Sequence, residues 1–325
     1  MGDKKRLISV DCARALCMLF IIGIYHMKSA YLREPEVTTF MKLTIVPVLS
    51  TFTAISAWFL GRRRIASRAD VIAFYRSRLA RAYPFFLLSC LTLYVVSLIV
   101  GKYIHGVKQL ILTLLGLSTV FGPAPSTVWY ISMLMLFWLL TPLFTWRRKK
   151  TAADAALRMA GLMLFIALLW GLDRLGADVD LRVVLYGIVY FTVLILSPWI
   201  NLDDAIRPIP ALAAALVFAG AQFIPATSGW LRVIRQLLHA FSGVGLVLLA
   251  GRLCARVPQL SKVLGWVSYA SMVAYLFHRQ WLGVWLTVCG PFSVPLAALL
   301  VAVLIAGSWL AQWLYDRYVM PRLMA

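Results

Sequence analysis

Charged residues are scarce in this sequence, and acidic residues are the scarcest. Asp, Glu, Lys and Arg make up 14% of the 325 residues, with only 12 acidic side chains, whereas apolar residues make up 62%. Soluble domains carry roughly 25% charged residues. A water-soluble protein of this composition could not cover its surface with polar side chains. The composition therefore excludes a soluble globular protein and indicates one whose surroundings are lipid.

Several chemical signatures are also missing. The five cysteines have no C-x-x-C spacing, and most lie in apolar runs, which argues against a disulfide framework and a zinc site. The sequence has no Gly-rich phosphate loop, no zinc-protease signature and no G-x-S-x-G turn. We therefore expect no metal and no soluble-hydrolase chemistry.

Apolar segments of about span length fill most of the chain, since a transmembrane helix needs about 20 such residues. The sequence predicts an all-α, polytopic membrane protein of about ten transmembrane helices, forming a single domain over residues 1–325. The stretch 107–121 is too short to span and is predicted to be an interfacial or re-entrant helix. Asp11 and Arg14 interrupt the first apolar run, so we expect a retained span and not a signal peptide. The predicted spans lie near 7–28, 39–61, 79–100, 128–146, 155–172, 182–200, 209–224, 236–254, 266–288 and 292–316.

The net charge of +20 comes from basic residues whose distribution along the chain indicates the membrane topology. Most basic residues fall in alternate loops, which places both termini in the cytoplasm by the positive-inside rule. A nucleic-acid partner is not expected, and the charge bias favours a bacterial inner (plasma) membrane. The basic residues assigned to the cytoplasmic side include Lys4, Lys5, Arg6, Arg62, Arg63, Arg64, Arg68, Arg76, Arg78, Arg81, Arg147, Arg148, Lys149 and Lys150.

Ionisable residues inside predicted spans are functional candidates, because a charge at mid-membrane costs at least ~2.5–3.5 kcal/mol. Asp11 and Arg14 lie three residues apart, on one helix face, and a structural ion pair is the alternative to a catalytic role. His26 lies further along the same span, where a simple interfacial histidine is the alternative. His278 lies near mid-membrane in the ninth predicted span. Two such histidines facing one cavity would suit a general base.

Arginines gather between the second and third predicted spans. The segment Arg78-x-x-Arg81-x-x-Pro84 places two guanidinium groups on one helix face, and such groups bind phosphate through paired hydrogen bonds. A cytoplasmic phosphate ligand is one interpretation; a topology anchor that touches anionic lipid is the other.

The sequence resembles the acyltransferase-3 membrane acyltransferases in several motifs that occur in family order. The first span, with Asp11, Arg14 and His26, is similar to the opening of the family. Ser56 lies in a segment similar to the family's S-G-F, with Ala57 in place of glycine. The basic segment that contains Arg76, Arg78 and Arg81 is similar to R-x-x-R-x-x-P. The later matches are Thr127 to Tyr130, Phe137 to Pro142, and Ser268 to His278, which includes Tyr275.

The chain departs from the family pattern in three places. Eleven residues separate Arg14 from His26, where the family usually has ten. On an ideal helix the extra residue turns His26 by about 100°, so a π-bulge or a changed role is required. Leu134 stands where an acidic residue is common. The chain stops at Ala325, so we expect no appended soluble domain.

The resemblance implies transfer of acetyl from acetyl-CoA, as co-substrate, to a hydroxyl of a polysaccharide, antigen or lipid-linked sugar, with no metal. It implies catalytic roles for His26, Arg14 and His278, with His26 as general base or as carrier of the acetyl group. The expected acetyl-CoA ligands are Arg78, Arg81, Arg76, Arg62 and Ser56, and the expected acceptor ligands are Trp129, Tyr275 and Tyr130. A transporter or flippase for a glycolipid is the alternative function, since polar residues in spans also line transport pathways.

Overall fold

The computed structural model describes residues 7–26, 35–99, 106–123, 125, 128–200, 208–225, 229–290 and 293–324. The named elements in these ranges are all helices, and an isolated bridge joins Ile65 to Trp146. The all-α prediction is therefore confirmed. Lys4, Lys5, Arg6 and the motif residue Thr127 lie outside the described residues.

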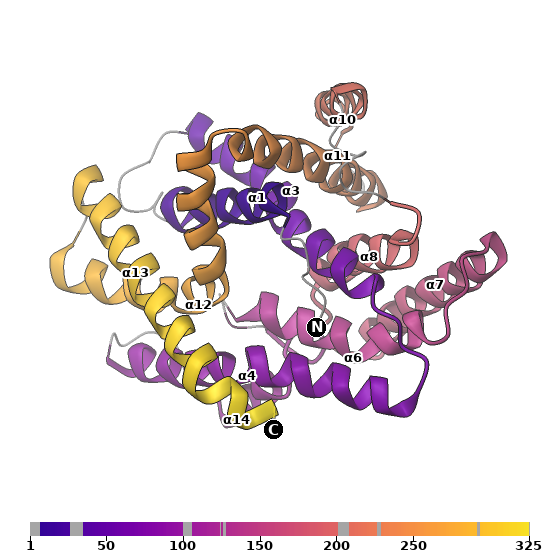
Figure 1. Ribbon diagram of the computed structural model, residues 1–325, viewed down its shortest axis with the longest axis horizontal. Helices are drawn as coiled ribbons and strands as arrows, with labels where there is room; N and C mark the ends of the chain where they lie inside the picture. Colours follow the sequence, from indigo (N-terminus) through magenta and orange to yellow (C-terminus); the bar gives the residue numbers. More distant parts are fainter. Residues whose placement is uncertain are drawn as a thin grey trace. The chain divides into compact units, whose positions relative to one another are not determined.

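The helices follow one another along the chain as coloured in Figure 1. In the first half they are α1 (Ile8–Leu19), the π-helix η1 (Phe20–Tyr25), α3 (Pro35–Gly61), α4 (Arg68–Ile99), α5 (Val107–Leu114), α6 (Trp129–Thr145), α7 (Ala152–Arg174) and α8 (Leu181–Leu196). In the second half they are α10 (Pro208–Ala221), α11 (Gly229–Ala255), α12 (Pro258–Cys289), α13 (Val294–Leu314), the π-helix η2 (Tyr315–Val319) and α14 (Met320–Met324).

Each of the ten predicted spans corresponds to a helix. Among the described residues, seven helical stretches are long and apolar enough to cross a membrane, and three apolar helices, in α6, α8 and α10, are shorter. An α-helix of 17 residues, the length of α6, covers about 25 Å, which is slightly less than a 30 Å hydrocarbon core. The chain is a polytopic membrane protein. The short helix predicted within 107–121 is α5, of eight residues.

The largest difference from the predicted boundaries is at the start of α4. α4 begins at Arg68, not near residue 79, because a capping box starts the helix before the apolar run. The Ser67 hydroxyl accepts from the Asp70 amide at 3.2 Å, and the Asp70 carboxylate accepts from the Ser67 amide at 2.9 Å. The basic residues between positions 68 and 81 consequently lie on the first turns of a continuous helix and not in a loop.

The chain forms two compact units, each made of several segments. The first unit comprises Met1–Ile55, Asn201–Tyr275 and Cys289–Trp313; the second comprises Ser56–Ile200, Leu276–Val288 and Leu314–Ala325. α12 contributes its first part to the first unit and its second part to the second. That residues 1–325 behave as a single domain stays a prediction.

In the first unit, α1 packs along α11, and α11 also packs against α10 (Figure 1). Small residues permit the close approach. A Cβ at Gly251 of α11 would lie 2.5 Å from the Ser9 carbonyl oxygen and 2.7 Å from the Ala13 amide nitrogen of α1. A Cβ at Gly243 would lie 2.4 Å from Cβ of Pro47 in α3. Glycine at these positions therefore determines how closely the helices around α1 pack.

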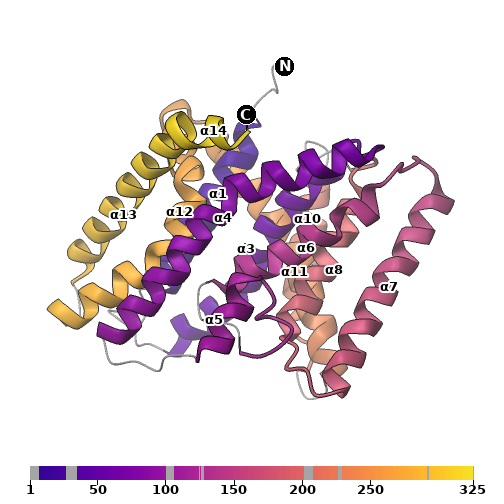
Figure 2. The same cartoon turned by 90° about the horizontal axis from the view of Figure 1, so that it is seen from below.

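In the second unit, α6 and α8 run parallel and in contact (Figure 2). Contacts advance together along both helices, from Trp129 with Tyr186, through Phe137 with Tyr190, to Phe144 with Phe191. Phe137, Tyr190 and Phe191 are completely buried. The amino-terminal ends of α6 and α8 thus lie together at one end of the pair, and the carboxyl-terminal ends lie together about 25 Å away.

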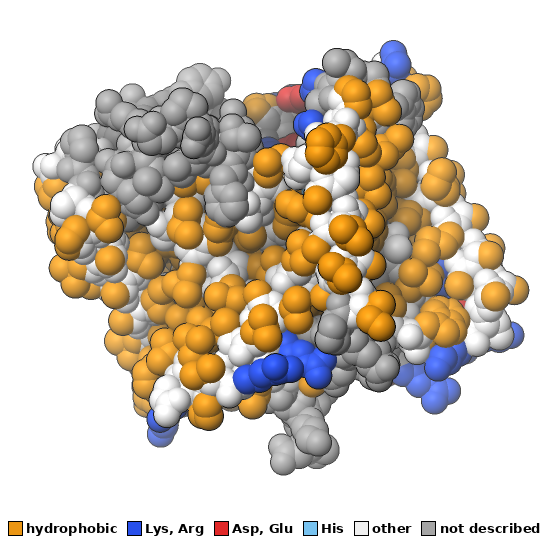
Figure 3. All heavy atoms as spheres, turned by 90° about the horizontal axis from the view of Figure 1, so that it is seen from above, with side chains coloured by type: hydrophobic (Ala, Val, Ile, Leu, Met, Phe, Trp, Pro, Cys, Tyr) orange, Lys and Arg blue, Asp and Glu red, His pale blue; other side chains and the backbone are white. Residues whose placement is uncertain are grey.

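The described surface is mostly apolar where the helices face outward. Figure 3 shows hydrophobic side chains over most of that face, with Lys and Arg gathered in a few patches. Large apolar residues such as Leu212, Leu216 and Met163 are more than three-fifths exposed. Such exposure is incompatible with water as the surrounding solvent and is expected for helices that face lipid.

Candidate active site

Asp11 and Arg14 lie on one side of α1, as their spacing predicts. Arg14 Nη1 and Asp11 Oδ1 are 4.0 Å apart, at the limit of an ion pair, and the side chains are 34% and 18% exposed. Neighbouring positions on α1 are buried, including Cys12, Ala13 and Ala15. Because the helix is otherwise packed, this pair forms a localised polar patch on a largely apolar helix.

Two serines of α12 hold this pair in place. Arg14 Nη2 donates to Ser271 Oγ at 3.1 Å, and Ser268 Oγ donates to Asp11 Oδ1 at 3.0 Å. Ser268 and Ser271 are one helical turn apart and nearly fully buried. The four side chains form a network across α1 and α12 that restricts the orientation of the Arg14 guanidinium group.

The segment between Arg14 and His26 contains a π-helix, η1. The His26 amide donates to the Ile21 carbonyl oxygen at 3.0 Å, which is the i to i+5 pattern of this helix type. A π-helical turn takes up one more residue than an α-helical turn. The π-helix therefore takes up the eleventh residue between Arg14 and His26. As a result, His26 lies on nearly the same side of the helix as it would with ten intervening residues and no bulge. The half-buried His26 ring packs edge-to-face against Tyr25, with centroids 5.0 Å apart.

The remaining candidate residues on α3 and α12 are divided between the two compact units. Tyr275 belongs to the first unit and is 6% exposed. His278 belongs to the second unit and is completely buried. Ser56, half-buried, is the first residue of the second unit. A shared cavity for His26 and His278 stays a prediction.

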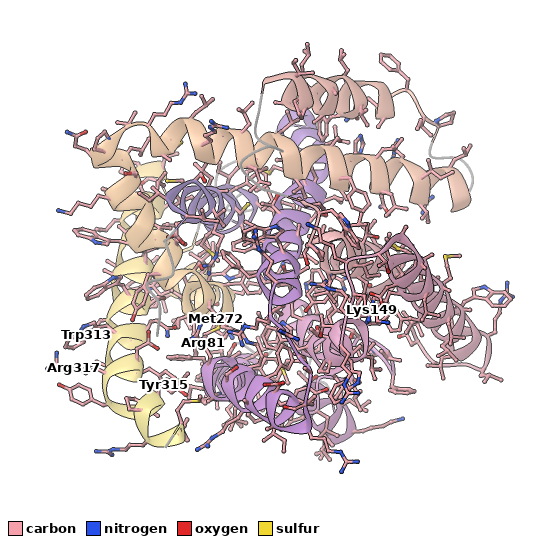
Figure 4. All side chains as sticks on the ribbon, turned by 45° about the vertical axis from the view of Figure 1, so that its right-hand side comes forward. Arg81, Lys149, Met272, Trp313, Tyr315 and Arg317 are labelled. Carbon is pink, nitrogen blue, oxygen red and sulfur yellow. The ribbon has the colours of Figure 1, made fainter. Side chains whose placement is uncertain are left out.

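Arg78, Arg81 and Arg63 form an arginine cluster in the second unit, at the start of α4. Arg63 and Arg81 are the nearest positive charges that act on Arg78. The Arg78 Nε is buried and has no hydrogen-bond partner among the described residues. Burial, and then repulsion from Arg81, lowers the pKa of Arg63. Arg63 and Arg78 are half-buried and Arg81 is exposed, and such mutually repelling arginines form a site that an anion would stabilise. Figure 4 labels Arg81 on α4.

Arg62 and Arg76 have other neighbours. The Arg62 guanidinium lies over the Trp58 ring, 4.6 Å from its centroid. Arg76 Nε donates to the Leu323 carbonyl oxygen of α14 at 3.1 Å. The same C-terminal region is held by Tyr315 of η2, labelled in Figure 4, whose hydroxyl donates to the Ala80 carbonyl oxygen. Arg76 therefore helps to attach the C-terminal segment to α4.

Arg148 joins three helix ends on the same side as the arginine cluster. Its Nη1 donates to the Leu194 carbonyl oxygen at 2.8 Å and to Ser197 Oγ at 3.3 Å, and its Nη2 donates to the Gly61 carbonyl oxygen. Burial, and then repulsion from Arg158, lowers its pKa. These carbonyl groups at the ends of α3 and α8 have no helical partner. Arg148 therefore has a structural role that satisfies them.

Aromatic side chains gather at the opposite end of α6 and α8. The Trp129 ring lies 5.7 Å from that of Tyr130 and 6.1 Å from that of Tyr186, between centroids. The Arg182 guanidinium covers Trp129 at 3.9 Å from the ring centroid, and Trp129 is 9% exposed. Trp129 and Tyr130, two of the three predicted acceptor ligands, thus belong to one aromatic wall, which the exposed Arg182 side chain covers.

Residues 7–313 match the acyltransferase-3 family model, described as an acyltransferase domain. The chain belongs to the acyltransferase-3 family. No protein of curated function and no solved structure matches it. The match confirms the resemblance and makes the protein a membrane acyltransferase.

Several residues around the acyltransferase motifs were not singled out from the sequence. Arg148 was counted only as a topology charge, and Arg182 and Tyr186 were not considered as site residues. The sequence contains one signal for the latter pair, because Asp180 and Arg182 flank the start of an apolar helix. Their position against Trp129 depends on the parallel packing of α6 and α8, which no local pattern reveals.

The acyltransferase requires a donor site, an acceptor site and a base, and no metal ligand set is evident among the described residues. No group of three or more His, Cys, Asp or Glu side chains lies close enough together there to hold an ion. The polar groups that gather are arginines, serines and aromatics, which suit anion and hydroxyl recognition.

Proposed function

We propose that this acyltransferase moves acetyl from cytoplasmic acetyl-CoA to a hydroxyl group of a cell-envelope carbohydrate. The observation that carries the proposal is the arginine cluster at the start of α4. Arg78 presents a buried Nε that has no hydrogen-bond partner among the described residues, beside Arg63 and Arg81 and within the region that matches the family. A phosphorylated donor such as acetyl-CoA supplies the negative charges that would stabilise these groups.

The two ends of the α6–α8 pair support separate donor and acceptor sides. Basic residues gather at the carboxyl-terminal ends of α6 and α8, where Arg148 binds Leu194 and Gly61. The aromatic wall lies at the amino-terminal ends. By the positive-inside rule, the basic end is cytoplasmic and the aromatic end faces the periplasm. The same rule applied to the loops along the sequence supports cytoplasmic termini in an inner (plasma) membrane.

In the proposed reaction, His26 takes the proton of the acceptor hydroxyl while the hydroxyl oxygen attacks the thioester carbonyl. The carbon–sulfur bond breaks, coenzyme A leaves as the thiolate, and the proton passes to it. Arg14, oriented by Ser271, stabilises the developing negative charge on the carbonyl oxygen. A route through an acetyl-histidine at His26 has the same overall balance. No metal is required, because a thioester is already an activated donor.

The test uses full-length protein in lipid nanodiscs. Acetyl-CoA binding is measured by calorimetry, and coenzyme A release, with and without envelope polysaccharide, by mass spectrometry. We expect Arg78→Ala to weaken acetyl-CoA binding about tenfold or more, because hydrogen bonds to charged groups contribute about 1.5–3 kcal/mol. We expect His26→Ala to bind acetyl-CoA normally and to release coenzyme A at least about 100-fold more slowly.

Arg68→Ala is the matched control for Arg78→Ala. Arg68 is an exposed arginine on the first turn of the same helix and is expected to leave binding unchanged. Wild-type protein that neither binds nor turns over acetyl-CoA would refute the donor assignment. Equal losses in Arg68→Ala and Arg78→Ala would show that general charge, and not the cluster, attracts the donor.

A further inference from the structure

Arg182 is an exposed arginine held rigidly at the aromatic end of α6 and α8. Its Nε lies 2.9 and 2.8 Å from the two carboxylate oxygens of Asp180, and its Nη2 also donates to that carboxylate. Asp180 is itself anchored, because its carboxylate accepts from the Arg182 amide at 3.0 Å and its own amide donates to the Thr119 carbonyl oxygen at 3.0 Å. The guanidinium is thus fixed before any ligand arrives.

The guanidinium also covers an aromatic ring. Its central carbon lies 3.9 Å from the Trp129 centroid, while the Trp129 ring makes a T-shaped contact with Tyr130 and a tilted contact with Tyr186. Tyr130 and Tyr186 are nearly fully buried, at 4% and 2% exposed. The Arg182 side chain remains 45% exposed. Among the described residues its Nη1 has no hydrogen-bond partner, so this end of the second unit presents a fixed donor on an aromatic support.

Two hydroxyl groups on the chain segment that binds the Asp180 amide have no hydrogen-bond partner among the described residues. Ser118 Oγ and Thr119 Oγ1 are buried and make no hydrogen bond with a described residue. Both residues lie on the chain that follows α5, at the point where the Thr119 carbonyl oxygen binds the Asp180 amide. Buried hydroxyl groups are nearly always paired, with protein, water or ligand. The chain segment that binds the Asp180 amide therefore carries two buried hydroxyl groups that a water molecule or a ligand would satisfy.

The charge balance of the pair selects the class of ligand. Asp180 neutralises Arg182, so the pair has little net attraction for a phosphate or carboxylate, in contrast to the arginine cluster. A neutral sugar ring has hydroxyl groups that can accept from Nη1 and donate to the carboxylate, and an apolar face that can lie against the exposed Arg182 side chain covering Trp129. We propose that Asp180, Arg182 and Trp129 form the subsite that binds the neutral sugar ring of the acceptor. This proposal rests on the proposed function and names the acceptor-binding residues of the same enzyme.

The experiment measures binding directly, without turnover. Hexyl β-glucoside is the sugar probe and hexyl phosphate the anionic probe, each added to full-length protein in nanodiscs. Saturation-transfer NMR reports contact with sugar-ring protons. We expect wild type to bind the glucoside in preference to the phosphate, and Arg182→Ala to weaken glucoside binding about tenfold. Arg182→Lys, which keeps the charge but loses the planar fork, should be weakened similarly.

Arg174 provides a matched control, because its guanidinium lies over the Trp170 ring at 5.2 Å. Arg174→Ala removes the same kind of contact and should leave glucoside binding unchanged. Asp180→Asn keeps a side-chain oxygen to cap α8 and tests the carboxylate if Arg182→Ala folds poorly. Equal binding in wild type and Arg182→Ala, or preference for hexyl phosphate, overturns the proposal. Wild-type protein that binds acetyl-CoA but not the glucoside also overturns the proposal. That outcome leaves the donor assignment intact.

Discussion

The π-helix before His26 makes a strong prediction about insertions and deletions. Deleting Gly23 should convert η1 into a regular α-helix with ten residues between Arg14 and the histidine. A Cβ at Gly23 would meet no atom within 4 Å, so this position is loosely packed and its removal disturbs few contacts. The histidine side chain would then lie on nearly the same side of the helix as it does in the wild-type protein.

Inserting one alanine after Gly23 should have the opposite effect. Without a second bulge, the insertion turns the histidine by about 100°. At a Cα radius of about 2.3 Å, this rotation alone moves the Cα by about 3.5 Å, and the imidazole moves further. A misplacement of about 1 Å can cost about 100-fold in rate. We expect the insertion to lose at least about 100-fold in coenzyme A release and the deletion to lose less than about tenfold.

The assay is coenzyme A release from acetyl-CoA by purified protein in nanodiscs, with acetyl-CoA binding measured alongside. Both variants should bind acetyl-CoA normally, because the arginine cluster lies in the second unit and η1 in the first. Equal losses of turnover in the two variants would refute the argument. A deletion that loses far more turnover than the insertion would also refute it. The enzyme would then need the π-helix η1 itself, and not only the orientation that η1 gives His26.

Three further predictions concern packing and charge. Arg63→Gln should raise the melting temperature by about 2 °C while weakening acetyl-CoA binding about tenfold in calorimetry. The lowered pKa of Arg63 means that its charged form costs folding free energy at neutral pH, and a lower melting temperature would contradict this. Gly251→Ala should lower the free energy of unfolding by about 1–3 kcal/mol in a denaturant titration, because its Cβ would meet the α1 backbone, whereas Gly171→Ala should not. Ser271→Ala should slow coenzyme A release about tenfold at unchanged acetyl-CoA binding, with recovery in Ser271→Thr; unaffected release would show that Arg14 does not need this contact.

Local sequence patterns were sufficient for the helices and for part of the candidate site. The ten apolar segments correspond to helices because each is long enough to satisfy its backbone in lipid. The i, i+3 spacing of Asp11 and Arg14 correctly placed them on one side of α1. The eleven-residue spacing to His26 predicted either a π-bulge or a changed role for His26, and the structure has a π-helix in that segment. The predicted start of the third span, near residue 79, was too late for α4. The prediction used hydropathy alone, whereas Ser67 and Asp70 cap the helix before the apolar run begins.

Composition and charge, read from the sequence alone, determined that this is a polytopic helical membrane protein, because solvent preference is a property of each segment. The motifs determined the acyltransferase family by themselves. Only the tertiary structure showed which arginines have partners within the protein. Arg148 satisfies helix ends and Arg76 binds the C-terminal segment, whereas Arg78 Nε has no hydrogen-bond partner among the described residues. The same packing brings Arg182 over Trp129, two residues 53 positions apart in the sequence. Such contacts depend on which helices pack side by side, and that choice is made by the whole chain and not by any one segment.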